Sequence, residues 1–157
     1  MTNKIIFLLV GFSISFNSFS QSVEDKELNK EITNLLMEYY AAVNTQDVNK
    51  TISYYLNSPD FITYVNGIAN NYEEWTNQVK AFLPTPKKIR YSFDTLYTRK
   101  ISDDAVYVTG PFHQDMTDKD NKASLADITA SMVLLKKNSE WKIAYATSVY
   151  LLRAAEK

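Results

Sequence analysis

The second half of the chain alternates between apolar and polar residues with a period of two, which predicts a run of β-strands. Four segments are rich in Val, Ile, Thr, Tyr and Phe, the residue types that suit a pleated, half-buried surface. They are Ile89–Thr98, Ala105–Met116, Ser124–Lys137 and Glu140–Tyr150. The breaks between them are short and contain Asp, Asn or Ser, which favour turns. Because a parallel connection needs a long crossover, these short breaks predict an antiparallel meander.

The first half of the chain follows the period of an α-helix. From Val23 to Asn44, apolar side chains recur every three or four residues and form one stripe. The stripe consists of Leu28, Ile32, Leu35, Leu36, Tyr39 and Val43. A second helix is expected to follow, capped by Asn44 or Thr45 and ending at about Leu56. A third is expected after Asn70-Asn71, whose side chains can cap its first turn.

One short strand is predicted between the second and third helices. Phe61–Val65 reads FITYV, and Asn66-Gly67 after it is the dipeptide that best suits a tight hairpin turn. The element order is then helix, helix, strand, helix and four strands. It predicts an α+β domain in which about three N-terminal helices cover a bent antiparallel sheet.

The first twenty residues have the pattern of a secretory signal peptide. Lys4 precedes the apolar run Ile5–Phe12, and Ser18-Phe19-Ser20 places small residues at both positions that matter for cleavage. We therefore expect a signal peptide at residues 1–20, a single domain at residues 21–157 and a periplasmic or secreted location. The apolar run is short for a membrane span, and an uncleaved anchor is the alternative.

The composition excludes several kinds of site. The 157 residues include no Cys and one His, so disulfides, thiol nucleophiles and metal sites with several His ligands are excluded within one chain. No metal or cofactor is expected. The net charge of −1 provides no electrostatic basis for binding nucleic acid. The 11 Tyr, 8 Phe and 2 Trp indicate a β-rich core or a ligand pocket lined by rings.

Three segments together resemble the nuclear transport factor 2-like superfamily, which includes ketosteroid isomerase, scytalone dehydratase and the SnoaL-like cyclases. Leu35–Gly67 is similar to the family's tyrosine-bearing helix, Asn/Asp corner and first strand. Ser102–Gly110 resembles the start of a middle strand, and Leu134–Ser148 resembles the last hairpin and strand. The similarity is greatest to exported bacterial proteins of the SnoaL-like branch. It implies a cone-shaped sheet wrapped around the long helix, with a pocket between them.

Ketosteroid isomerase defines what chemistry this resemblance implies, since its reaction uses a carboxylate base and two oxyanion donors, a tyrosine and a protonated acid. Tyr39 lies where the resemblance places the tyrosine. The place of the base holds Thr63-Tyr64-Val65, and the place of the second acid holds Ser131-Met132-Val133. Neither contains a carboxylate, which argues against that proton transfer.

Strand parity divides the predicted meander into two faces. The apolar face contains Val106, Val108, Phe112, Met116, Ala126, Ile128, Ala130, Met132 and Leu134. The mixed face contains Tyr107, Thr109, His113, Asp115, Asp127, Thr129, Ser131, Trp141, Tyr145 and Thr147. Parity alone leaves open which face lines the pocket, and a bulge expected at Gly110-Pro111 can reverse it.

The leading functional hypothesis is an exported domain that binds a small apolar or aromatic molecule in a hydrophobic, aromatic-lined pocket. Its expected ligand-binding residues are Tyr39, Tyr64, Trp75, Tyr107, Thr129 and Tyr145. One alternative is a lyase or isomerase that uses Asp127 or His113 as its catalytic residue. An inward-facing Asp127 would have a pKa raised by desolvation.

A protein-interaction module is the third hypothesis. Three helices can cover only one face of such a sheet, and large exposed apolar patches are rare in soluble monomers. A homodimer that pairs through the other face is therefore expected.

Overall fold

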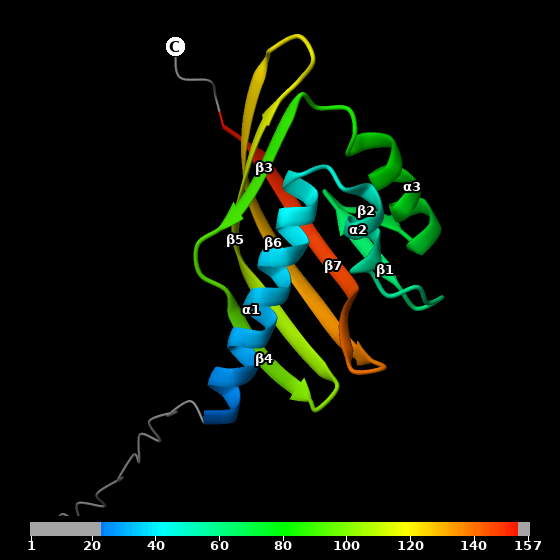
Figure 1. Ribbon diagram of the computed structural model, residues 1–157, viewed down its shortest axis with the longest axis vertical. Coiled ribbons are helices and arrows are strands. Elements are labelled where there is room, and N and C mark those ends of the chain that lie inside the picture. Colours follow the sequence, from blue (N-terminus) through cyan, green and yellow to red (C-terminus); the bar gives the residue numbers. More distant parts are fainter. Residues whose placement is uncertain (1–22, 154–157) are drawn as a thin grey trace, which may run out of the picture.

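The computed structural model describes residues 23–153, and Figure 1 shows their arrangement. The elements are α1 (Val23–Asn44), α2 (Val48–Ser53), β1 (Ile62–Val65), β2 (Ile68–Asn70), α3 (Tyr72–Phe82), β3 (Lys88–Phe93), β4 (Tyr97–Ser102), β5 (Ala105–Thr117), β6 (Ala123–Lys137) and β7 (Glu140–Leu152). The α+β class and the three helices are as predicted. The signal peptide expected at residues 1–20 lies outside the described residues.

The seven strands form one bent sheet in the order β2-β1-β7-β6-β5-β3, with β4 also pairing with β5. The last three strands form a long antiparallel meander, as their short connecting turns predict. The sheet as a whole is mixed rather than antiparallel, because β1 runs parallel to β7, with Thr63 opposite Ala146. These two strands are separated by most of the chain, so no short turn restricts their relative direction.

The segment Ile89–Thr98, expected as one strand, is divided between β3 and β4, which pair with successive halves of β5. Gly110 lies at the junction of the two halves. A Cβ atom at this residue would lie 2.6 Å from the carbonyl oxygen of Thr95, so only glycine allows the β3–β4 connection to pass this close. The bulge expected at Gly110-Pro111 is absent, since β5 stays in register with β6 throughout.

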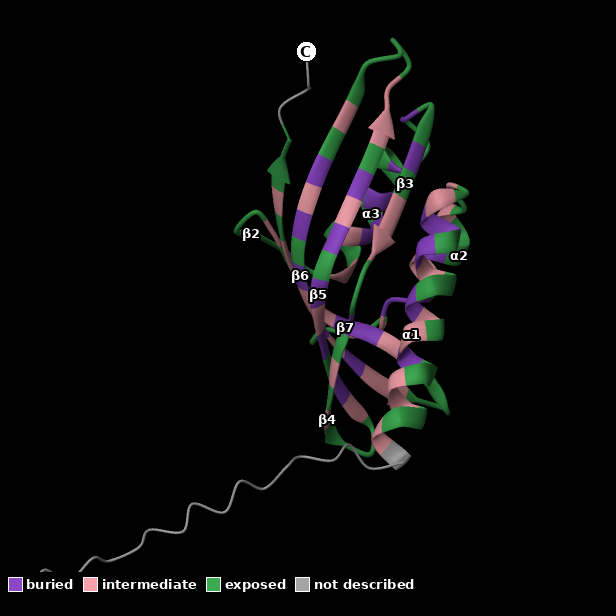
Figure 2. Cartoon of the chain, turned by 90° about the vertical axis from the view of Figure 1, so that its left-hand side faces the viewer, coloured by how far each residue is buried: buried purple, intermediate pink, exposed green. Residues whose placement is uncertain are grey.

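All three helices lie on one side of the sheet, and α1 crosses it diagonally (Figures 1 and 2). The apolar stripe of α1 faces the strands, with Ile32 and Leu36 fully buried. Along the strands, buried and exposed residues alternate (Figure 2). The predicted apolar face is the one beneath the helices, since Val108 and Ile128 are buried while Tyr107 and Thr129 are exposed. We call it the inner face, and the helix-free opposite side the outer face.

A register shift between β6 and β7 moves one aromatic residue to the other face. Val133 pairs with Tyr145, but Leu134 pairs with Ile143, so Ala144 is the extra residue. Trp141, expected on the mixed face, therefore lies on the inner face and is 5% exposed. Tyr145 remains on the outer face, because the bulge reverses the alternation between the two residues.

Polar side chains fix the ends of the helices. Asn71 caps α3 and exchanges hydrogen bonds with Glu74, which confirms the cap expected at Asn70-Asn71. The cap of α2 is Asp47 rather than Asn44 or Thr45. The Asn44 side chain instead pairs with the backbone of Tyr91 through two hydrogen bonds of 2.6 and 3.0 Å. These bonds attach the end of α1 to β3.

Candidate functional site

A cavity lies between the sheet's inner face and the helices α1 and α3, and we call it the inner cavity. Its volume is about 120 Å³. The bent sheet creates the space, because flat packing of helices on strands would fill it with side chains. For scale, an engineered cavity of about 150 Å³ lined by aliphatic and aromatic side chains binds benzene.

Rings dominate the lining of the inner cavity. The aromatic lining residues are Tyr39, Tyr40, Tyr55, Tyr64, Trp75, Phe82, Tyr91, Phe112 and Tyr150. Aliphatic side chains from both layers, such as Val43, Val79, Ile128 and Met132, fill the spaces between them. Among the described residues, the lining contains no Asp, Glu, His, Lys or Arg. Within residues 23–153, the titratable groups that line the cavity are therefore all phenols.

Four of the phenols form two hydrogen-bonded pairs. The hydroxyl oxygens of Tyr39 and Tyr55 are 2.7 Å apart, and those of Tyr91 and Tyr150 are 3.3 Å apart. The Gln114 amide, buried on the inner face, donates to the Tyr91 hydroxyl. The first pair joins α1 to the segment after α2, and the second joins β3 to β7, so they hold the cavity wall together as well as giving it polar groups.

Burial keeps these phenols uncharged. Desolvation raises the pKa of Tyr39 and Tyr55 well above the ordinary value, and the neighbouring hydroxyl adds to this rise at Tyr39. Desolvation also raises the pKa of Tyr91 and Tyr150. At neutral pH the cavity thus presents hydroxyl donors and acceptors but no charge.

Three of the six residues expected to bind ligand line the inner cavity, and three do not. Tyr39 and Trp75 belong to the lining, and so does Tyr64, although the alternation along β1 turns its ring toward Tyr145 on the outer face. Tyr107 and Thr129 lie on the outer face of β5 and β6 and are exposed. Tyr145 also lies there, with its ring 6.3 Å from that of Tyr64. Tyr107, Thr129 and Tyr145 were expected to bind ligand on the assumption that the mixed face lines the pocket. The helices instead cover the apolar face, so the cavity lies on the other side of the sheet from these three residues.

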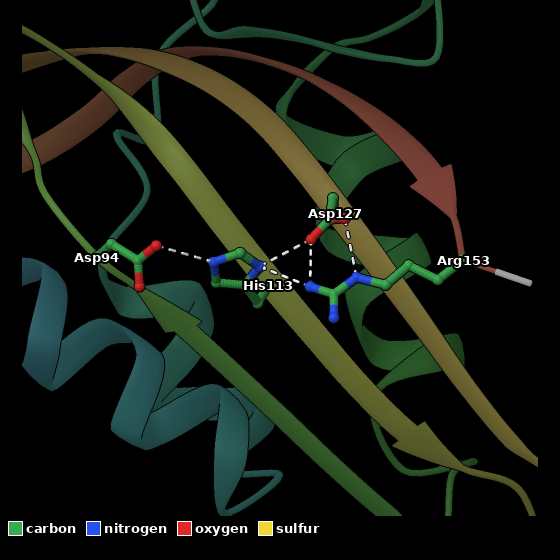
Figure 3. A network of polar contacts seen from close by, with 4 residues as sticks. All are labelled: Asp94, His113, Asp127 and Arg153. Carbon is green, nitrogen blue, oxygen red and sulfur yellow. Dashed lines mark hydrogen bonds and ion pairs between the residues drawn. The ribbon is translucent and has the colours of Figure 1, made fainter. Parts of the chain in front are cut away.

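The two catalytic candidates, His113 and Asp127, lie together on the outer face, on the opposite side of the sheet from the cavity (Figure 3). His113 Nδ1 is 2.8 Å from an oxygen of Asp127, and Nε2 is 3.1 Å from an oxygen of Asp94. Arg153, just after β7, donates from both its Nε and a terminal nitrogen to Asp127. His113 thus bridges two carboxylates beside a guanidinium group.

This network favours the charged forms of His113 and Asp127. Hydrogen bonds to Asp94 and Asp127 raise the pKa of His113. Hydrogen bonds from Arg153 and His113 lower the pKa of Asp127 to about 2, the opposite of the rise expected for an inward-facing carboxylate. A general base needs a pKa near the operating pH, and Asp127 is therefore a poor one. The network instead fastens the end of β7 to the middle of the sheet.

Several residues that line the cavity are not among those predicted from the sequence. Thr51 and Thr63 are each 2% exposed and line the cavity, as do Tyr55, Tyr91 and Tyr150. The alternation in FITYV, with Phe61 and Thr63 on one side, was the available signal for Thr63. Tyr150 pairs with the inward-facing Ile128, and the alternation along β7 from the outward-facing Tyr145 was the available signal for it.

Within residues 23–153, no group of three or more His, Asp or Glu side chains is arranged to hold a metal ion. Helices long and apolar enough to cross a membrane are likewise absent from this part of the chain.

Residues 32–151 match the family model of the SnoaL-like domain. A candidate calcium/calmodulin-dependent protein kinase II association domain from Xanthomonas campestris has a similar structure, with 23% identity, a TM-score of 0.67, and coverage of 78% of this chain and 86% of that one. A nuclear transport factor 2-like protein from Salmonella enterica has 15% identity, a TM-score of 0.70, and coverage of 84% and 95%. A ketosteroid isomerase-like protein from Erwinia carotovora has 18% identity, a TM-score of 0.65, and coverage of 80% and 97%. No curated protein matches the sequence.

Proposed function

The chain belongs to the SnoaL-like domain family, and within that family we propose that it binds a small, uncharged apolar or aromatic molecule in the inner cavity. The observation that carries this proposal is the lining itself, in which rings and aliphatic side chains surround a few hydroxyl groups. Binding sites for small molecules commonly have this composition, with an apolar wall and a few polar groups that fix orientation.

Size and charge limit the ligand. A volume of about 120 Å³ suits a molecule near the size of benzene, and ligands of drug size occupy larger sites of roughly 300–1,000 Å³. The absence of cationic side chains among the described lining residues disfavours carboxylates and phosphates. An anion there would lose its hydration without gaining a partner.

Binding without proton transfer is favoured over isomerase or lyase chemistry. One structure of the same fold is described as ketosteroid isomerase-like, and the ketosteroid isomerase reaction needs a carboxylate base near the ligand. Here the corresponding places in the cavity wall hold Thr63 and Met132. His113 and Asp127 belong to the outer face, so neither can reach a molecule in the cavity without passing through the sheet.

Two neighbouring residues on β6 provide the test, because Ala130 lines the cavity and Thr129 faces outward. Ala130→Leu should fill the cavity and abolish binding of benzene, whereas Thr129→Leu should leave it unchanged. Shifts of the Met132 methyl resonance on adding benzene report binding directly. Benzene that leaves the wild-type resonance unmoved, or that binds Ala130→Leu equally well, would contradict the proposal.

We further propose that binding takes place outside the cytoplasm, in the periplasm or after secretion. The support is the signal pattern in Met1–Ser20. The intact mass of the exported protein should match a chain that begins at Gln21. A full-length chain retained in the membrane fraction would be inconsistent with cleavage.

A further inference from the structure

Three polar side-chain atoms in the wall of the inner cavity make no hydrogen bond within the described part of the chain. They are the hydroxyl oxygens of Thr51 and Thr63 and the indole nitrogen of Trp75, all shielded from solvent. They come from three separate elements, α2, β1 and α3. Buried polar groups in native proteins are nearly always hydrogen-bonded, so three such groups around one cavity need a common explanation.

The chemistry of these atoms specifies what a partner must offer. An indole N–H can only donate, so Trp75 requires an acceptor. Threonine hydroxyls can donate to the same acceptor or accept from a donor. Both threonines are 2% exposed, which leaves bulk solvent unable to serve them.

The adjoining tyrosine pair adds another donor. Two phenols that share one hydrogen bond use one of their two protons, which leaves the other O–H of the Tyr39–Tyr55 pair for a third partner. The Trp75 ring packs against Tyr55, with ring centres 6.0 Å apart. Burial raises the pKa of Tyr55, and the Tyr39 hydroxyl and the Trp75 indole N–H partly offset that rise, yet the indole N–H makes no hydrogen bond within the described residues. Among these groups the indole N–H of Trp75 is the one that can only donate, so at least one acceptor is required.

We infer that the ligand carries an uncharged acceptor oxygen, a carbonyl, and that this oxygen lies against Thr51, Thr63 and Trp75. The whole ligand is an apolar molecule of about seven non-hydrogen atoms, the size that the cavity volume allows. The inference rests on the proposed function, because it adds the chemical class to a ligand of the same cavity. A carbonyl fits better than a carboxylate, since the described lining holds no cation to neutralise it. It fits better than a hydroxyl, because a carbonyl oxygen can accept from the indole N–H and a threonine hydroxyl without adding a proton that would need a further buried acceptor.

Cyclohexanone and methylenecyclohexane make a matched pair of probes, because they differ only in an oxygen and a methylene group at the same position. If the carbonyl satisfies buried donors, the protein should bind cyclohexanone about tenfold more tightly, the ratio that corresponds to about 1.4 kcal/mol for a hydrogen bond. Titration followed by the Met132 methyl resonance gives both dissociation constants.

Variants assign the preference to these side chains. Trp75→Phe keeps the ring and Thr63→Val keeps the shape, and each should reduce the ratio toward one while still binding methylenecyclohexane. Trp141→Phe is the matched control, since that indole N–H is also buried without a partner but lies outside the inner cavity. Thr129→Val, on the exposed outer face, is a second control in case Trp141→Phe does not fold. Both controls should retain the ratio.

The outcomes separate the inference from the proposed function. Equal binding of the two probes by the wild-type protein would overturn the acceptor and leave the apolar site standing. It would mean that internal water already satisfies the three groups. Binding of neither probe would overturn both. A preference that survives in both Trp75→Phe and Thr63→Val would also overturn the assignment of the oxygen to these residues.

Discussion

Thr63→Val is expected to stabilise the protein when it is free of ligand. Thr63 lies in β1, between β2 and β7, and is 2% exposed. Its hydroxyl makes no hydrogen bond to any described residue. Valine has nearly the same shape and suits a strand equally well, so the substitution replaces an unsatisfied hydroxyl with a methyl group and disturbs little else.

The magnitude follows from the desolvation of that hydroxyl. A buried donor or acceptor without a partner destabilises the folded state by roughly 1–3 kcal/mol. Because the hydroxyl can relax toward neighbouring atoms, we expect a gain of about 1–2 kcal/mol in the free energy of unfolding. For a domain of this size, the melting temperature should rise by about 3–8 °C.

Urea denaturation of protein stripped of bound molecules measures the effect. Thr129→Val is the control, because the same substitution on the exposed outer face should change the stability by less than about 0.5 kcal/mol. A loss of about 1 kcal/mol or more in Thr63→Val would refute the reasoning, since it would show that the hydroxyl has a partner. A gain combined with lost cyclohexanone preference would show that this residue serves binding at the expense of stability.

Three further predictions concern the rest of the fold. The pKa of His113, the only histidine, should lie above 6.5 by NMR titration and should fall toward that value in Asp94→Asn or Asp127→Asn. The stability that His113 contributes is therefore present below pH 6.5 and is lost as the pH rises through its folded pKa. The stability that Asp127 contributes is present above about pH 3.8 and is lost as the pH falls toward 2. Equal unfolding midpoints of the wild type and Asp127→Asn at about pH 5 would contradict this. Gly110→Ala should destabilise the protein by about 1–3 kcal/mol in urea, because its Cβ would meet the Thr95 carbonyl oxygen, and an unchanged midpoint would show that the β3–β4 connection can move aside. We also propose that a second copy of the chain covers the outer face, where Tyr107, Val149 and Leu151 are exposed. The wild type should then sediment as a dimer and Tyr107→Asp as a monomer. A wild-type mass of one chain at all concentrations would exclude the dimer.

The elements that depend on local pattern could be predicted from the sequence. The first helix has the predicted bounds, Val23–Asn44, because its apolar stripe is long and uninterrupted. The cap at Asn71 and the hairpin turn at Asn66-Gly67, where both residues have positive φ, follow from side-chain chemistry and backbone freedom. β5, β6 and β7 lie within two residues of their predicted bounds, since strong alternation and short turns define them.

What depends on distant contacts could not be predicted. The parallel pairing of β1 with β7 joins segments about eighty residues apart, and no local sequence pattern in either strand indicates this pairing. The division between β3 and β4 depends on where β5 bends at Gly110. Strand parity separated the two faces correctly along β5 and β6, but the choice of the face beneath the helices required the position of α1.

That choice of face decides what the cavity can do. Along β6, Asp127 points outward while its neighbours Ile128 and Ala130 face the helices. A shift of one residue in register would reverse every side chain and would place a carboxylate inside the cavity, where desolvation would raise its pKa toward the range of a general base. The observed register instead leaves that carboxylate paired with Arg153 and His113 in solvent. The outward position of this carboxylate therefore leaves the described lining of the cavity without an acid, which is why we propose binding rather than proton transfer for it.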